Sequence, residues 1–195
     1  MNKFIENLVT DSIRFSCEYE RTRKFFRTLE KLSNLTNVYE FDIFNIPDKQ
    51  HVLAHNHGFK VFGKVADMYI LGPASKRPVY GLFYHKLFEN PYRRAFLESW
   101  NAIPTNKLKK IQDYTKNGEI IALAPSGPEH LPSERGELGA AWIAKTLQVP
   151  IIPTKIIQGP HYVRIEPREE ILVPADATKE MLREITNQVI EELKK

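Results

Sequence analysis

The alternation of short apolar strands with amphipathic helices is the feature that most limits how this 195-residue chain can fold. Runs rich in β-branched and other apolar residues recur along the chain, and turn residues or helical patterns separate them. We expect strands at 38–44, 51–55, 78–84, 119–124, 151–157 and 162–165, and helices at 88–100, 107–116, 136–147 and along the C-terminus. This order predicts a single layered α/β domain, in which helices flank a central mixed sheet.

The first 36 residues predict a helical segment that precedes the α/β domain, which we place at 37–195. Apolar residues recur at helical spacing in this segment, and a highly charged stretch at 18–24 divides them. Two interpretations remain open. The apolar face either covers the core of the domain, or it lies in a membrane interface with Phe25 and Phe26 in lipid.

Composition and charge exclude several classes of protein. A hydrophobic fraction of 42% with 27% charged residues is typical of a globular chain rather than a disordered one. The net charge of +4 suits an anionic membrane surface, a phosphorylated substrate or an acidic carrier protein. No nucleic-acid-binding motif accompanies the positive charge, so we expect no nucleic-acid partner.

Cysteine content and hydropathy indicate the compartment. Cys17 is the single cysteine, which excludes an intramolecular disulfide and fits a reducing environment. The N-terminus carries Glu6 and Asp11 and lacks the apolar core of a signal peptide. No stretch approaches the roughly 18 consecutive apolar residues that a spanning helix needs. We therefore expect a cytoplasmic protein, either free or peripheral on the inner face of the membrane.

The predicted strand at 51–55 runs directly into His55-Asn56-His57-Gly58. Reactive groups of α/β folds gather where strands end beside glycine loops. An imidazole there can take a proton from a hydroxyl, and it works best when a carboxylate holds its other ring nitrogen. Asp67 is the nearest downstream acid. Two alternatives remain, a packing role or a metal pair made by His55 and His57.

Two further segments combine a buried strand or helix with polar loop residues. The strand at 119–124 leads into Pro125-Ser126-Gly127-Pro128-Glu129, a turn whose backbone amides can face a phosphate or an oxyanion. Arg135 comes just before the predicted helix at 136–147, where it could bind a phosphate together with the first amides of the helix.

The order of these segments resembles the four motif blocks of the lysophospholipid and glycerol-phosphate acyltransferases. Asn56-His57 is similar to the first block, and the stretch 100–106 is similar to the second. Ala124-Pro125-Ser126-Gly127 resembles the strand and Pro-Glu-Gly turn of the third, and Val149-Pro150-Ile151-Ile152-Pro153 resembles the fourth. The resemblance covers residues 37 to 166.

The sequence departs from that pattern at three places. Nine residues lie between His57 and Asp67, whereas the family usually has its aspartate four residues past the histidine. Ser126 replaces the glutamate of the third block, and Asn106 stands where an arginine is common. His55-Asn56-His57-Gly58 is more similar to the His-Pro-His-Gly block of the diacylglycerol acyltransferase branch.

The resemblance implies an enzyme that moves a fatty acyl group from acyl-CoA or acyl-carrier protein to a hydroxyl of a glycerolipid, lysophospholipid or glycerol-phosphate acceptor. His57 would be the general base and Asp67 its partner. The residues implied in substrate binding are Asn56, Gly58, Ser126, Gly127, Glu129 and Arg135. The implied reaction needs neither a cofactor nor a metal.

Two functional alternatives stay open at this point. Ser126 could be the nucleophile of a hydrolase, although the Gly-x-Ser-x-Gly elbow that presents such a serine is missing. The chain could also be a non-catalytic lipid-binding module with the same fold. The first alternative predicts a covalent acyl-enzyme, and the second predicts lipid binding that survives loss of His57.

Overall fold

The described part of the chain excludes the N-terminal segment. The structure, a computed structural model, describes residues 40–43, 46–58, 60–61, 64–65, 67–98, 101–126, 137–159 and 162–195. The helical segment predicted at 1–36 and the domain boundary at 37 lie outside these residues.

Seven strands form the central sheet, in the order β1-β9-β8-β2-β7-β5-β6. Strands β8, β2, β7, β5 and β6 run parallel to one another, and β9 pairs antiparallel with β8 and parallel with β1. This arrangement confirms the predicted mixed sheet. The strands are β1 (Glu40–Ile43), β2 (Val52–His55), β5 (Val79–Phe83), β6 (Ala102–Pro104), β7 (Ile120–Leu123), β8 (Ile151–Gln158) and β9 (Tyr162–Pro167).

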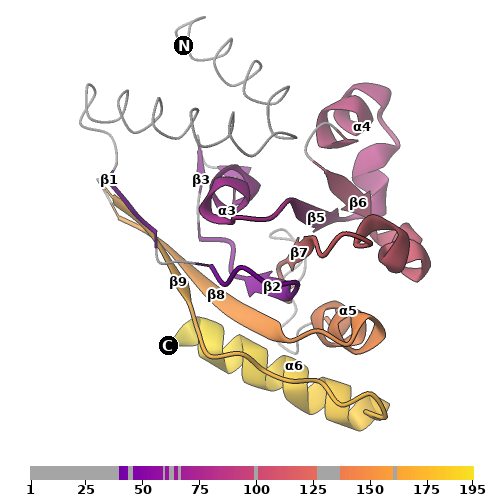
Figure 1. The fold of residues 1–195 in the computed structure, drawn as a ribbon. Coiled ribbons are helices and arrows are strands. Elements are labelled where there is room, and N and C mark those ends of the chain that lie inside the picture. Colours follow the sequence, from indigo (N-terminus) through magenta and orange to yellow (C-terminus); the bar gives the residue numbers. More distant parts are fainter. Residues whose placement is uncertain are drawn as a thin grey trace, which may run out of the picture.

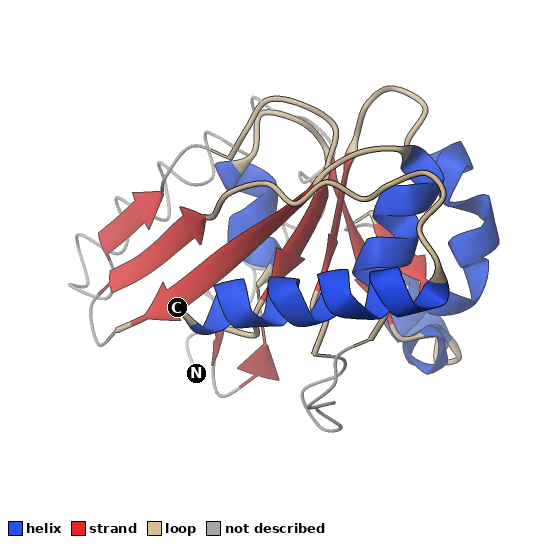
Figure 2. Ribbon diagram, turned by 90° about the horizontal axis from the view of Figure 1, so that it is seen from below, coloured by secondary structure: helices blue, strands red, loops and turns tan. Residues whose placement is uncertain are grey.

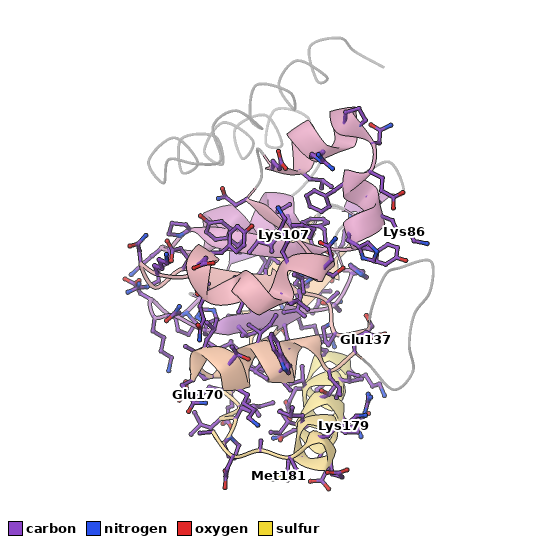
Figure 3. All side chains as sticks on the ribbon, turned by 90° about the vertical axis from the view of Figure 1, so that its right-hand side faces the viewer. Lys86, Lys107, Glu137, Glu170, Lys179 and Met181 are labelled. Carbon is purple, nitrogen blue, oxygen red and sulfur yellow. The ribbon has the colours of Figure 1, made fainter. Side chains whose placement is uncertain are left out.

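Helices cover both faces of the sheet, so the layered architecture is confirmed as well (Figure 1). Helix α3 (Met68–Ala74) lies on one face, and α5 (Gly139–Leu147) and α6 (Lys179–Lys194) lie on the other. Seen from below, α6 runs across the strands (Figure 2). Helices α5 and α6 pack side by side (Figure 3). No helix in the described ranges is long and apolar enough to cross a membrane.

Strand β2 lies at the centre of the sheet and is buried on both faces. Val52 and Ala54 pack into the apolar cluster beneath α5 and α6, and Leu53 packs into the cluster beneath α3. All three residues are 0% exposed. A fully buried leucine or valine contributes roughly 1.5–3 kcal/mol relative to an exposed one. This packing fixes the strand, and with it the direction in which the chain leaves its carboxyl end.

The connections differ from the predictions mainly between β2 and β7. The helix predicted at 88–100 is divided into the 3-10 helix η1 (His85–Phe88) and the α-helix α4 (Pro91–Glu98). Pro91 causes the division, because proline disfavours helical backbone in the residue before it and suits the first helical position. The helix predicted at 107–116 is the 3-10 helix η2 (Thr105–Tyr114). Helix α3, strand β6 and the small hairpin β3 (Lys60–Val61) and β4 (Lys64–Val65) are additional elements.

His51 is a buried histidine immediately before β2. Its side chain is fully buried, and its Nδ1–H donates to the carbonyl oxygen of Lys49 at 2.7 Å. Its Nε2 is buried without a hydrogen-bond partner. Burial disfavours the charged imidazolium and lowers the pKa of His51 to about 4, against the opposing effect of the Lys49 carbonyl. His51 is therefore neutral in the folded protein at neutral pH.

This burial predicts acid-dependent destabilisation. Because the folded pKa of His51 is lowered from 6.5, the unfolded chain binds the proton first as the pH falls below 6.5, and the folded state loses stability until about pH 4. Between pH 7.5 and 5.0, His51 should account for about 2 kcal/mol of lost unfolding free energy. Urea unfolding of His51→Asn should show a correspondingly smaller loss than the wild-type chain. Equal losses in the two proteins would contradict this account.

Candidate active site

The candidate site begins at the carboxyl end of β2. His55 is the last residue of the strand, and Asn56, His57 and Gly58 follow it. The parallel strands β7 and β5 end at the same edge of the sheet. Side chains from several connections therefore converge there, as they do in other α/β proteins.

Asn56 ties the loop after β2 to the neighbouring strand β8. Its Oδ1 accepts a hydrogen bond from the backbone N–H of Ile156 at 2.7 Å, and its Nδ2 donates to the Ile156 carbonyl oxygen at 2.9 Å. The strand pairing of β2 with β8 ends at His55 and Thr154. The amide side chain thus extends this pairing beyond the strand, and holds the backbone of the next residue, His57, in place.

Gly58 allows the same loop to lie directly against β8. A Cβ atom at this position would come within 2.0 Å of the Ile156 carbonyl oxygen, far inside van der Waals contact. A glycine is therefore required where the chain leaves His57. Asn56 and Gly58 precede and follow His57, and both contact Ile156. These contacts restrict the position of the His57 backbone from both sides.

His57 and Asp67 form a close pair. The Nδ1 atom of His57 lies 2.9 Å from Oδ2 of Asp67. An ionised carboxylate can only accept, so Nδ1 carries the hydrogen and the neutral ring has its lone pair on Nε2. The Asp67 side chain is 2% exposed, whereas that of His57 is 23% exposed. The pair thus has a buried acid behind a histidine that reaches solvent.

Asp67 is positioned by the start of α3. Its backbone carbonyl accepts hydrogen bonds from the N–H groups of Ile70 and Leu71, both at 3.1 Å, while its side chain does not cap the helix. Ile70 and Leu71 are buried in the cluster between α3 and the sheet. Because α3 is anchored in this way, the carboxylate is directed toward His57 despite the nine intervening residues.

His55 lies on the other side of the same carboxylate. Its Nδ1 is 3.6 Å from Asp67 Oδ2 and 3.0 Å from the carbonyl oxygen of Asn56. Burial lowers the pKa of His55, although the Asp67 charge acts in the opposite direction. The rings of His55 and His57 meet edge to face, with centroids 6.0 Å apart. The structure therefore brings both histidines and Asp67 into one cluster.

The remaining residues that the sequence predicted to bind substrate do not belong to the cluster of His55, His57 and Asp67 as the structure describes it. Ser126 follows β7, the strand beside β2, and is half-buried. Gly127, Glu129 and Arg135 lie outside the described residues. The segment after Arg135 returns to the strand end, because Glu137 donates its backbone N–H to the Pro125 carbonyl oxygen. Lys86 lies shortly after β5, and both Lys86 and Glu137 lie on the right-hand side of the view in Figure 3.

Sequence reasoning missed two contributors to the site. One is the main chain of Ile156, which carries no side-chain signal that a motif could reveal. The other is the place of His55 in the cluster with Asp67. The i, i+2 spacing of His55 and His57 signalled a shared face, but the third member, Asp67, is positioned by α3, which begins at the next residue and which the sequence pattern did not predict.

Comparison with known proteins shows what fold the chain has. No protein-family model matches the sequence, and no curated protein sequence matches it. Among solved structures, the chain is similar to the 1-acyl-sn-glycerophosphate (LPA) acyltransferase PlsC from Thermotoga maritima. The match has a TM-score of 0.59 and 18% identity, and it covers 98% of this chain and 89% of that one. The chain therefore has the fold of an LPA acyltransferase, which is the fold that the sequence resemblance implied.

The close contact between Gly58 and Ile156 predicts that adding a single methyl group at Gly58 destabilises the fold. Gly58→Ala should lower the free energy of unfolding by about 1–3 kcal/mol, because the new Cβ must displace the loop from Ile156. Gly139→Ala at the first residue of α5 is the matched control, because the nearest atom that a Cβ would meet there is 3.4 Å away and alanine is the better helix former. Thermal or urea unfolding of both variants tests the difference. Equal stabilities would show that Gly58 is not pressed against β8.

Proposed function

We propose that the chain is an acyltransferase of the glycerolipid acyltransferase superfamily, in which His57 is the general base and Asp67 orients it. The observation that carries this proposal is the 2.9 Å contact between His57 Nδ1 and Asp67 Oδ2 at the carboxyl end of β2. A buried carboxylate holding one ring nitrogen is the arrangement that directs the other nitrogen toward a substrate proton.

The reaction follows from this geometry. His57 Nε2 removes the proton from an acceptor hydroxyl, and the oxygen attacks the carbonyl carbon of an acyl thioester. The tetrahedral intermediate collapses by breaking the carbon–sulfur bond, and the departing thiolate takes the proton back from the imidazolium. Asp67 stabilises the imidazolium between these two transfers. No covalent acyl-enzyme is formed and no cofactor is consumed.

Exposure favours His57 over His55 as the base. The His57 side chain is 23% exposed and can meet a bound hydroxyl, whereas that of His55 is 5% exposed and faces the Asn56 carbonyl. A general base must come within hydrogen-bond reach of the proton that it removes. We therefore propose His57, the more exposed of the two histidines, as the base.

The substrates are proposed from the fold and the resemblance together. Acyl-CoA or acyl-carrier protein would be the donor, and a lysophospholipid, another glycerolipid or glycerol-phosphate the acceptor. The loops after β2 and β7 would form the acceptor site, with Asn56, Gly58, Ser126, Gly127, Glu129 and Arg135 as its residues. The net charge of +4 would favour anionic substrates and the anionic cytoplasmic surface of a membrane. We place the protein in the cytoplasm or on that surface.

An acyl-transfer assay with mass-spectrometric detection tests the function. Purified protein is given acyl-CoA or acyl-carrier protein with a panel of lysophospholipids, glycerol-phosphate and diacylglycerol. His57→Ala should lower kcat about 10²–10⁴-fold, which is the usual contribution of a positioned general base. Asp67→Asn should lower kcat within the same range, about 10²–10⁴-fold, because an amide neither fixes the tautomer nor stabilises the imidazolium. KM should change little in both variants.

A surface carboxylate provides the control for these variants. Asp113→Asn removes an exposed acid of η2 that pairs with Lys116 beyond the helix end, and it should keep the wild-type kcat. Product formation that persists in His57→Ala would remove His57 from its role. A burst of acyl-enzyme lost in Ser126→Ala would favour the hydrolase. Lipid binding without product across the panel, and unchanged in His57→Ala, would favour the lipid-binding module.

A further inference from the structure

The proposed catalytic pair leaves one member of the histidine cluster unexplained. A general base and its carboxylate require only His57 and Asp67, yet His55 Nδ1, which contacts the Asn56 carbonyl oxygen at 3.0 Å, also lies 3.6 Å from the same carboxylate oxygen inside the protein. His55 is nearly fully buried, so its imidazole has almost no contact with solvent. Three side chains of the kind that binds metal ions thus surround one small space, and the two imidazoles can each offer an Nδ1 lone pair once that nitrogen loses its hydrogen.

The spacing of this cluster fits a transition-metal ion. One ligand atom from each of His55, His57 and Asp67 lies within 4.8 Å of the others. The two Nδ1 atoms are 3.6 Å and 2.9 Å from Asp67 Oδ2. A tetrahedral zinc ion with bonds of about 2.0–2.1 Å holds its ligand atoms roughly 3.3–3.4 Å apart, a value between these two distances. The widest separation in the cluster, which is within 4.8 Å, would have to shorten when an ion binds.

We propose that His55, His57 and Asp67 also bind a divalent transition-metal ion of the zinc class. Two imidazole nitrogens and one carboxylate oxygen form a donor set that suits zinc, copper, nickel and iron rather than magnesium or calcium. The 23% exposure of the His57 side chain gives the ion a route from solvent. The backbone contacts of the Asn56 side chain hold His57 at the site before metal arrives.

Metal binding would block the proposed catalysis through the tautomer of His57. In the catalytic pair, Nδ1 carries the hydrogen and Nε2 the lone pair. A metal bound at Nδ1 needs the lone pair there, so the hydrogen of the neutral ring must move to Nε2. The same ring then has no lone pair with which to accept a proton from the acceptor hydroxyl. The metal site and the general base are therefore mutually exclusive, a consequence that rests on the proposed function, whereas the metal site itself does not.

Cobalt spectroscopy tests the site without relying on activity. Purified protein stripped with a chelator is titrated with Co²⁺, and the visible absorption of a tetrahedral ion is recorded. We expect one equivalent to bind and Zn²⁺ to displace it. His55→Phe and Asp67→Asn should each weaken binding about 100-fold or more, since even outer-shell changes cost 10–100-fold. His85→Phe, which removes a histidine beside Thr105 at the end of β5, should bind as the wild-type protein does.

The outcomes separate the two proposals. Stoichiometric Co²⁺ binding that depends on both His55 and Asp67 supports the metal site, whether or not acyl transfer is found. Absence of the cobalt spectrum in wild-type protein, or an unchanged spectrum in both variants, would overturn it. If acyl transfer is found, Zn²⁺ should inhibit it over the concentration range in which Zn²⁺ displaces Co²⁺, and a chelator should restore it. Full activity with Zn²⁺ bound would overturn the mutual exclusion.

Discussion

The hydrogen bond between His57 and Asp67 depends on contacts from three parts of the fold. The burial of β2 between two layers of helices fixes where the strand ends. Asn56 and Gly58 fasten the following loop to Ile156 of β8, and the burial of Ile70 and Leu71 anchors the start of α3, from which Asp67 extends. A small shift in any of these contacts would separate two atoms that must remain 2.9 Å apart. The rigidity of the central sheet is thus a condition of the proposed chemistry.

Much of the fold was predictable because the strands of a covered parallel sheet are continuous apolar runs. The segments around Val52, Ile120 and Ile151 are of this kind, and all became central strands. Helix α3 was not predicted because its seven residues are too few to display a period, and because two of them, Gly72 and Pro73, are typical of loops. Its packing on the sheet, through Ile70 and Leu71, compensates for this weak local preference.

The candidate site was predictable in its residues but not in its geometry. A strand ending in His55-Asn56-His57-Gly58 marked the position, since only a few residue types can act as a base near neutral pH. The distance along the chain from His57 to Asp67 could not show that the two side chains meet. Their meeting depends on the short strands β3 and β4 between them and on α3, which begins directly after Asp67. The bonding of the Asn56 amide to a backbone one hundred residues away left no trace in the local sequence.

The tautomer of His57 is the most direct test of the central claim, because both the proposed catalysis and its block by metal depend on it. Two-dimensional ¹⁵N–¹H NMR of metal-free protein labelled at histidine, recorded near neutral pH with His57→Ala for assignment, identifies which ring nitrogen carries the hydrogen. We predict a neutral ring protonated at Nδ1, which changes toward Nε2–H when Asp67 is replaced by asparagine. A neutral ring protonated at Nε2 alone in the wild-type protein would contradict the account, because Nδ1 would then have no hydrogen to donate to Asp67.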